Sequence, residues 1–420
     1  MSALTTMTAQ SPSQTPQPAA SVGPTFAVLS ALYLAQGLPS GLFAHALPVF
    51  WREAGFALSW IGALKLLALP WVLKALWSPW LDRSLRQGTP PLRWIGRLQL
   101  SAAGLLVVLA VIGVTPEGVG LWGAASLILA INLLMATQDI ITDGLAVRWL
   151  PARWRGVANT VQVAGYKVGM LVGGALLLLL AENIGFARAL VIPAALLMIL
   201  YLLIRLAAPM RQPVSTTSVD DAPIRDGLTG LLRTAGIWPW LAIMASFKIA
   251  DAMGSGMIRP MLSDLGWTTG RIGTFTLISS LVGLLGAALG GWLYQRLGSR
   301  RSLILTGLAQ AATIAAWAMV PQFSAEAELV YTVGLLEQLA DGASTVALFA
   351  VMMSLCRTGW EGTDFTLQAS LQVVFAGLFG LAGGLLAELA GYNTLFVASA
   401  LAGVLVILIL AITTRHRHLT

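Results

Sequence analysis

Long apolar runs without a charged side chain recur along the whole sequence, for example at residues 98–114, 171–181 and 395–413. Of the 420 residues, 57% are hydrophobic and only 10% are charged, whereas a soluble domain carries roughly 25% charged residues. So few charges cannot cover a surface that faces water. A helix of about 20 apolar residues crosses the ~30 Å hydrocarbon core of a bilayer. The sequence therefore predicts an all-α integral membrane protein.

Twelve segments are predicted to cross the bilayer: 25–50, 58–80, 97–115, 121–145, 157–181, 188–207, 237–262, 271–295, 302–320, 329–353, 364–387 and 393–413. The polar stretch 208–236, rich in Pro, Ser, Thr and Asp, separates them into two groups of six. The expected organisation is a disordered tail (1–24), an N-terminal six-helix lobe (25–207), a cytoplasmic linker (208–236), a C-terminal six-helix lobe (237–413) and a short tail (414–420).

The arginines lie almost entirely in alternate loops. With the N-terminus in the cytoplasm, the inner loops and tails hold 17 arginines, and the outer loops hold only Arg52, Arg188 and Arg271. Basic residues accumulate on the cytoplasmic side of membrane proteins, so both termini are predicted to be cytoplasmic. This placement also explains the net charge of +7 without a nucleic-acid partner.

The sequence lacks the usual signatures of enzymes and metal sites. A single cysteine, Cys356, excludes a disulfide framework and a cysteine metal cluster. We find no zinc motif, phosphate-binding loop or nucleophile elbow. The sequence thus predicts neither an enzyme nor a protein with a metal or cofactor, and an ATP-driven pump is disfavoured.

Three pairs of short matches indicate that the two halves are parallel repeats. The residue numbers differ by nearly constant amounts, which favours duplication of a six-helix unit. Ile61-Gly62 matches Ile272-Gly273, and Pro48 matches Pro260. The set Gly156, Thr160 and Gln162 matches the set Gly362, Thr366 and Gln368. Such repeats, with a site between them near the bilayer midplane, are an architecture of secondary transporters.

Several longer stretches resemble known transporters. GWLYQRLGSRR (291–301) resembles the loop motif of the major facilitator superfamily, and SPWLDRSLRQG (78–88) is a degenerate version of it. The stretches QGLPSGLFAHALP (36–48), LKALWSPWLDR (73–83), ATQDIITDG (136–144) and GYKVGMLVGG (165–174) resemble AmpG-type muropeptide permeases. Within that group, the stretches QGLPSGLFAHALP (36–48) and LKLLALPW (64–71) are closer to single-chain siderophore permeases of the pyochelin type.

The resemblance implies a proton-driven transporter of the bacterial inner membrane that works by alternating access, and it is expected to be a monomer. Its implied cargo is a siderophore, meaning a small ferric chelate. A muropeptide permease is the alternative, and export of a small molecule is a third possibility. A membrane sensor that has lost transport is the rival of a different class. Intramembrane carboxylates count against that rival, because ionisable groups at membrane depth usually serve function.

Carboxylates inside predicted spans are the candidates for proton coupling. Glu337 and Asp341 are four residues apart and share one helix face, roughly 12–18 Å into their span. Two carboxylates in a low dielectric cannot both ionise cheaply, so either is a candidate proton carrier, and static pairing with a lysine is the alternative. Asp139 matches the QD of the AmpG-type motif and is a further candidate, as is His45, which titrates near neutral pH.

Polar residues at similar depth are candidates for binding substrate. Lys248 and Asp251 share a face of the seventh span, either as a static pair or facing the ligand. Gln36 and Lys248 each lie 12 residues before a matched proline, so the repeat places them at equivalent sites. Lys65 and Lys167 would either bind an acidic substrate or neutralise Asp139 and Glu337. Gln138 and Gln338, beside two of the acids, complete this set.

A third group of residues lies at the cytoplasmic ends of the helices. By resemblance to the superfamily loop motif, these residues would lock helix ends together in one access state: Asp82, Arg83, Arg296, Arg300 and Arg301. Asp143 is predicted to act as an inner gate or loop anchor that pairs with Arg148 or Arg155.

Overall fold

The computed structural model describes residues 22–413 except 54, 56–66, 68, 114–117, 207–222 and 324–325. These described residues form helices and contain no strand. The C-terminal tail, residues 1–21 of the predicted N-terminal tail, most of the linker and Lys65 lie outside them. Residues 22–24, predicted as part of the disordered tail, instead begin the first helix.

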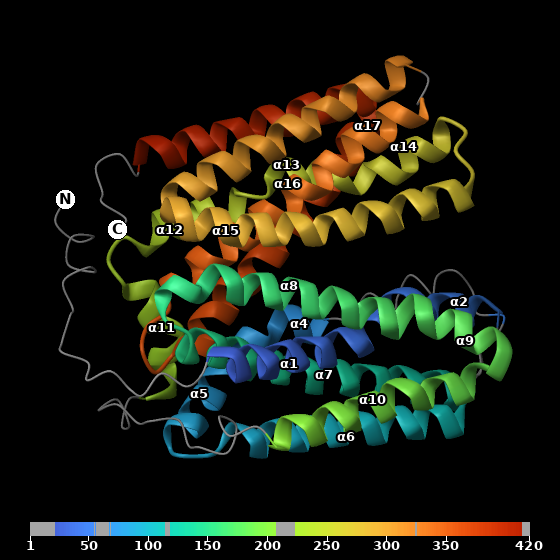
Figure 1. The fold of residues 1–420 in the computed structure, drawn as a ribbon, viewed down its shortest axis with the longest axis vertical. Helices are drawn as coiled ribbons and strands as arrows, with labels where there is room; N and C mark the ends of the chain where they lie inside the picture. Colours follow the sequence, from blue (N-terminus) through green and yellow to red (C-terminus); the bar gives the residue numbers. More distant parts are fainter. Residues whose placement is uncertain are drawn as a thin grey trace.

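The first half of the chain forms the lower bundle in Figure 1. The first span consists of α1 (Val22–Gly41), a π turn (Leu42–Ala46) and α2 (Leu47–Glu53). The described part of the second contains α4 (Leu69–Leu73) and α5 (Ser78–Arg86). Then follow α6 (Pro91–Ile112), α7 (Gly118–Trp149), α8 (Arg155–Leu171), a π turn (Val172–Leu176), α9 (Leu177–Ile184) and α10 (Phe186–Leu206).

The second half forms the upper bundle, from yellow to red in Figure 1. It follows the linker helix α11 (Ile224–Arg233). The seventh span is broken into α12 (Ile237–Ser246), α13 (Ile249–Gly254) and α14 (Ile258–Asp264). The remaining helices are α15 (Thr269–Ala316), continued by a 3-10 segment (Trp317–Phe323), α16 (Ala327–Ser354) and α17 (Glu361–Thr413).

The twelve predicted spans agree with this arrangement. Nine helices among the described residues are long and apolar enough to cross a membrane. Two of these, α15 and α17, each contain two spans joined at Gly298 and Gly391. Both glycines have positive φ, 74° and 80°, a conformation that side chains with a Cβ disfavour. The remaining predicted span, 58–80, is only partly described.

Close backbone contact between α1 and the α8 region organises the first bundle. A Cβ added to Gly169 would lie 2.3 Å from the Leu34 carbonyl oxygen, and one on Gly173 would lie 1.9 Å from that of Leu38. Small residues allow membrane helices to approach this closely. The outer surface is aliphatic, with residues such as Leu381 and Leu389 about three-quarters exposed, as lipid-facing helices require.

The two bundles meet mainly at one end of the molecule. There α17 contacts α5, α7 and α11, and α15 contacts α8. Both ends of the described chain lie toward this same side in Figure 1. We call this region, where α5, α11 and the first turn of α17 meet, the closed end.

Candidate functional site

Lys248 is the centre of a buried polar cluster in the second bundle. It lies at the break between α12 and α13, inside the seventh span. Its Nζ donates to Asp341 Oδ1 at 2.6 Å and to Gln310 Oε1 and Ser344 Oγ at 3.0 Å each, and it lies 3.4 Å from Asp251 Oδ2. The predicted pairing of Lys248 with Asp251 is therefore present. The ammonium group of Lys248 also pairs with a second carboxylate, that of Asp341.

Glu337 lies one helical turn from this cluster but outside its ion pairs. It is only 1% exposed, and its Oε2 accepts a hydrogen bond from Gln338 Nε2 at 3.0 Å. Its Oε1 is buried and has no hydrogen-bond partner among the described residues. A cavity of about 130 Å³ adjoins it, with Ser255, Arg259 and Ser279 on the wall. The two acids predicted as proton carriers are thus in different environments.

An ion pair between Lys74 and Asp139 is the corresponding feature of the first bundle. Both side chains are buried, and Lys74 Nζ contacts Asp139 Oδ2 directly. Sequence reasoning considered Lys65 as the partner of Asp139. The structure shows that Lys74 fills this role, and Lys65 lies outside the described residues.

The predicted pairing of Asp143 with Arg148 or Arg155 is wrong. Asp143 Oδ1 instead accepts hydrogen bonds from Tyr33 Oη and Gln162 Nε2, each at 3.0 Å. Asp143 is 1% exposed and lies inside the first bundle, because its helix face points toward α1 and α8 rather than toward the loop.

Gln36 and Gln138 also lie in the interior of the first bundle. Gln36 Nε2 donates to Thr142 Oγ1 at 2.9 Å, and Gln138 Nε2 lies 3.5 Å from the Leu32 carbonyl oxygen. Both side chains are fully buried. Contact of either residue with a substrate remains a prediction.

Lys167 reaches from the first bundle to the second. A Cβ added to Gly283 in α15 would lie 3.1 Å from Lys167 Nζ and 3.4 Å from Gln338 Oε1. Lys167 is half-buried and forms no ion pair within the part of the chain that the structure describes. His45 is exposed, and its ring packs beside Gly174 in the second π turn; its proposed role stays a prediction.

Two polar contacts join the bundles at the closed end. Arg148 in α7 donates from Nη2 and Nε to Glu361 Oε2, at 2.6 and 3.2 Å. Asp82 in α5 accepts hydrogen bonds on Oδ2 from the backbone N–H and the hydroxyl of Thr363, both at 2.7 Å. Burial raises the pKa of Asp82 to about 6, although nearby Arg148, at 3.7 Å, acts to lower it.

The linker helix α11 packs against the same junction. Arg357 binds both carboxylate oxygens of Asp364, at 2.6 and 2.8 Å, and donates to the Gly227 carbonyl oxygen of α11 at 2.7 Å. The Arg86 guanidinium lies 3.9 Å from the ring centroid of Trp360. The closed end therefore includes the linker as well as both bundles.

The other predicted gating residues are less engaged than Asp82. Arg300 Nη2 donates to the Ala411 carbonyl oxygen at 3.0 Å, which ties the middle of α15 to the end of α17. Arg83, Arg296 and Arg301 form no ion pair within the described ranges. Their locking role remains a prediction.

Sequence reasoning did not select several residues that the structure places in these clusters: Lys74, Gln310, Ser344, Glu361 and Thr363. A signal existed for Lys74, since a lysine within a span requires an acidic partner. Glu361 and Thr363 follow a short loop, where nothing local reveals a contact with the opposite bundle.

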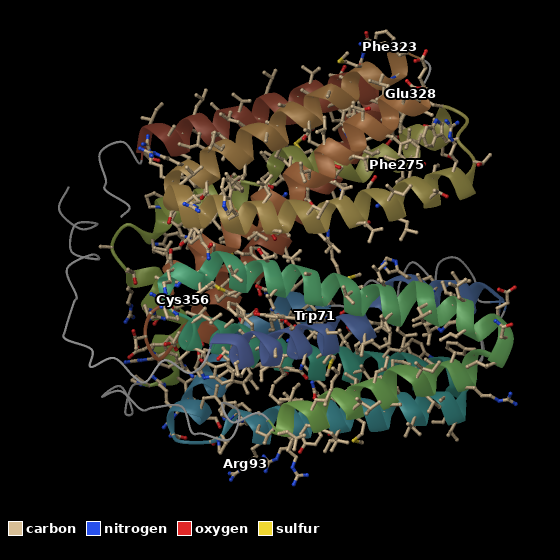
Figure 2. All side chains as sticks on the ribbon, in the orientation of Figure 1. Trp71, Arg93, Phe275, Phe323, Glu328 and Cys356 are labelled. Carbon is tan, nitrogen blue, oxygen red and sulfur yellow. The ribbon has the colours of Figure 1, made fainter. Side chains whose placement is uncertain are left out.

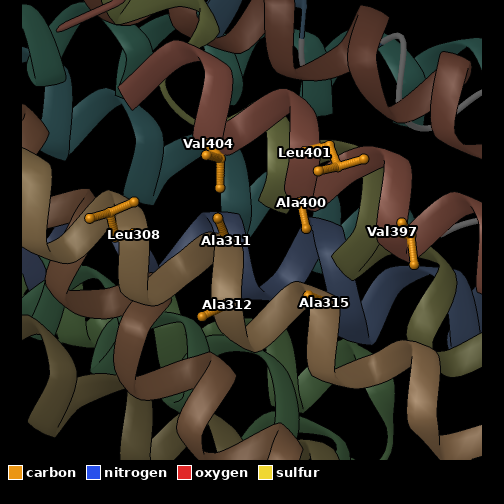
Figure 3. Close-up of a pocket in the computed structure, with 8 residues that line it drawn as sticks. All are labelled: Leu308, Ala311, Ala312, Ala315, Val397, Ala400, Leu401 and Val404. Atoms are coloured by element: carbon orange, nitrogen blue, oxygen red, sulfur yellow. The ribbon is translucent and has the colours of Figure 1, made fainter. Parts of the chain in front are cut away.

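A larger cavity, of about 400 Å³, lies between the second half of α15 and the second half of α17. Figure 3 shows its lining, which consists of Leu308, Ala311, Ala312, Ala315, Val397, Ala400, Leu401 and Val404. None of these side chains carries a polar group, so this cavity does not suit a polar cargo. Among the described residues, no group of three or more His, Cys, Asp or Glu is arranged to hold a metal ion.

Comparison with known proteins agrees with this architecture. Residues 29–374 match the Major Facilitator Superfamily. The chain belongs to this superfamily. Its similarity to the anhydromuropeptide permease of Escherichia coli K12 is 31% identity over 404 residues, covering 92% of this chain and 79% of the permease. A protein of Rickettsia felis that bears the name "Putative transporter AmpG 4" is 26% identical over 379 residues, covering 87% of this chain and 91% of that protein. The chain is therefore a superfamily transporter of the AmpG permease type, and not an enzyme.

Solved structures show the same superfamily fold. The fucose:proton symporter of Escherichia coli superposes with a TM-score of 0.71 at 15% identity, covering 94% of this chain and 98% of the symporter. A bacterial homologue of the iron transporter ferroportin, in its outward-facing state, gives 0.67 at 16% identity, covering 93% and 100%. At such identities the similarity concerns the fold alone.

Proposed function

We propose that this transporter imports anhydromuropeptides, which are sugar–peptide fragments of the cell wall, across the bacterial cytoplasmic membrane. The observation that carries the proposal is the 31% identity with an anhydromuropeptide permease over 404 residues. This similarity extends over almost the whole chain and favours the muropeptide alternative over the siderophore cargo expected from short stretches of sequence. The siderophore expectation gains no support from the relatives described above.

The polar residues near the junction of the bundles support a cargo of this class. Lys167 presents a half-buried ammonium group beside Gln338, where it can pair with a peptide carboxylate. A carboxylate that binds there also draws the second bundle toward the first. Such contact with both bundles is the basis of alternating access in this type of transporter.

The proton gradient is the proposed driving force. Buried carboxylates are rare in membrane spans, and they often form proton relays in transporters. The arginine-rich loops support a cytoplasmic location for the closed end. With that orientation we infer an outward-facing state, supported by the contacts of Arg148 with Glu361 and of Asp82 with Thr363, which join the bundles at the closed end.

Uptake by purified protein in liposomes tests this function. A radiolabelled anhydromuropeptide should accumulate when the liposome interior is alkaline relative to the outside, and a protonophore should abolish the accumulation. A ferric siderophore is the parallel substrate. Uptake of the siderophore without uptake of the muropeptide would contradict the proposed cargo, whereas uptake of neither would favour a sensor.

A further inference from the structure

Glu337 differs from every other acid of the buried clusters in having a carboxylate oxygen without a partner. Its Oε1 is buried and unbonded among the described residues, whereas Asp341, Asp251 and Asp139 each lie in an ion pair. Burying an unpaired carboxylate is strongly unfavourable. In this conformation Glu337 is therefore stable as the neutral acid.

The surrounding charges favour the same protonation state. Lys248 is already shared by Asp341 and Asp251, so a third ionised carboxylate would leave the cluster with excess negative charge. Two further cations lie near the cavity: Lys167 from α8, whose Nζ lies beside Gly283 and Gln338, and Arg259, whose Nε donates to Thr276 on the cavity wall. Neither forms an ion pair with Glu337.

The 130 Å³ cavity beside Glu337 has the chemistry of a water site. Its wall carries the hydroxyls of Ser255, Ser279 and Ser280, and Ser279 Oγ is itself buried without a hydrogen-bond partner among the described residues. A volume of this size holds about four waters, and each water needs two to four polar partners. The cavity wall supplies such partners.

The cavity lies away from the closed end. Both Ser255 and Arg259 follow the break at Lys248 in the seventh span: Ser255 begins a 3-10 turn (Ser255–Met257), and Arg259 lies in α14. Arg259 and Gly256 are exposed, so the wall of the cavity extends to the molecular surface. Phe275, which also contributes to the wall, is labelled in the upper bundle of Figure 2.

We propose that Glu337 is the proton-carrying carboxyl of this transporter, and that the adjoining cavity holds the waters that deliver the proton from the side opposite the closed end. In the loading step, a hydronium ion in the cavity transfers one proton to the Glu337 carboxylate and becomes water. In the release step, the carboxylic acid returns that proton to water on the other side. Asp341 acts instead as the fixed partner of Lys248.

This inference rests on the proposed proton-driven import, and two transport assays separate the roles. Proton-driven accumulation of anhydromuropeptide needs the carrier, whereas counterflow without a proton gradient needs only binding and alternating access. We expect Glu337→Gln to lose accumulation and keep counterflow. Glu328→Gln is the matched control, because Glu328 is exposed at the start of the same helix (Figure 2), and it should retain both activities.

A second variant tests the cavity without touching the carboxyl. Gly256 lines the cavity, and a Cβ there would meet no atom within 4 Å, so Gly256→Val should fold and displace water. We expect it to reduce accumulation and spare counterflow. Normal accumulation by Glu337→Gln, or equal loss of both activities, would overturn the carrier assignment. Normal accumulation by Gly256→Val would overturn the water route.

A measurement without substrate separates this inference from the proposed cargo. Infrared difference spectra of the purified protein between acid and alkaline pH report the C=O stretch of titrating carboxylic acids. The Glu337→Gln variant should lack one band that wild type and Glu328→Gln both show. If wild type transports no anhydromuropeptide, the cargo proposal fails, but a band lost in Glu337→Gln still supports the carrier. An unchanged spectrum refutes it.

Discussion

The Arg148–Glu361 ion pair should control opening of the closed end. It joins α7 to the first turn of α17, with both side chains largely buried at 13% and 8% exposed and the nearest nitrogen and oxygen 2.6 Å apart. Truncating one partner of a buried charge pair costs about 2–5 kcal/mol. Because both groups retain some contact with solvent, we use the lower part of this range, about 2–3 kcal/mol.

This energy stabilises only the conformation in which the two bundles meet at the closed end. Glu361→Gln should therefore raise the open population about 30- to 150-fold, since each 1.4 kcal/mol is a factor of ten. The population of the open state can rise only until that state is the major one.

The single cysteine provides the assay. Cys356 lies at the closed end (Figure 2), and its Sγ donates to the Met352 carbonyl oxygen at 3.3 Å. Burial raises the pKa of its thiol well above the ordinary value. Because the thiolate is the reactive form, labelling by N-ethylmaleimide should be slow while the end is closed and should accelerate in Glu361→Gln.

Two control variants complete this experiment. Glu182→Gln removes an exposed carboxylate of α9 and should label like wild type. The charge exchange Arg148→Glu with Glu361→Arg, made together with Asp82→Asn because Arg148 lies 3.7 Å from the Asp82 carboxylate, should slow the labelling again, because it restores an opposite pair. Equal labelling rates in wild type and Glu361→Gln would refute the role of the ion pair. Rapid labelling of wild type would show that the closed end is not the resting conformation.

Three further predictions follow from charge burial and packing. Since the pKa of Asp82 is about 6 in the closed state and near 3.8 when the group is exposed, the ionised form penalises closure. Closure should weaken by about 3 kcal/mol in total as pH rises from about 4 to 6, and it should change little above pH 6. The distance between spin labels on opposite sides of the closed end should report this pH dependence, and Asp82→Asn should abolish the dependence. Gly169→Ala, whose Cβ would lie 2.3 Å from a carbonyl oxygen, should destabilise by about 1–3 kcal/mol and lower the melting temperature in detergent, whereas Gly104→Ala, where nothing lies within 4 Å, should not. Lys74→Gln leaves the buried Asp139 unpaired and should destabilise by about 3–5 kcal/mol in the same thermal assay, and adding Asp139→Asn should recover most of that loss; a double variant as unstable as the single one would contradict the pairing.

The fold was predictable because hydrophobic length determines it. A membrane span must be apolar over about 20 residues whatever its neighbours are, so the segments could be located one at a time. The break at Lys248 was not foreseen, because neither Gly nor Pro occurs at 247 or 248. There the side-chain cluster around the lysine, which includes residues from α15 and α16, accompanies the break.

The candidate site was predictable as a set of charges but not as a set of pairs. The cost of burying a charge in the membrane was enough to identify Glu337, Asp341 and Lys248 as candidate functional residues. Partners such as Lys74 and Asp139 are 65 positions apart, and their pairing depends on how helices are arranged. Helical periodicity gives the face of a single helix and carries no information about its neighbours.

The buried lysines set different requirements for biosynthesis. Lys248 has an acidic partner, Asp251, three residues later in the same span, so its charge can be paired as soon as that helix forms. Lys74 is synthesised first, and its partner Asp139 follows 65 residues later. At about 5–20 residues per second, the ribosome needs several seconds to supply Asp139. During that interval the membrane-insertion machinery must keep the helix that carries Lys74 in contact with water.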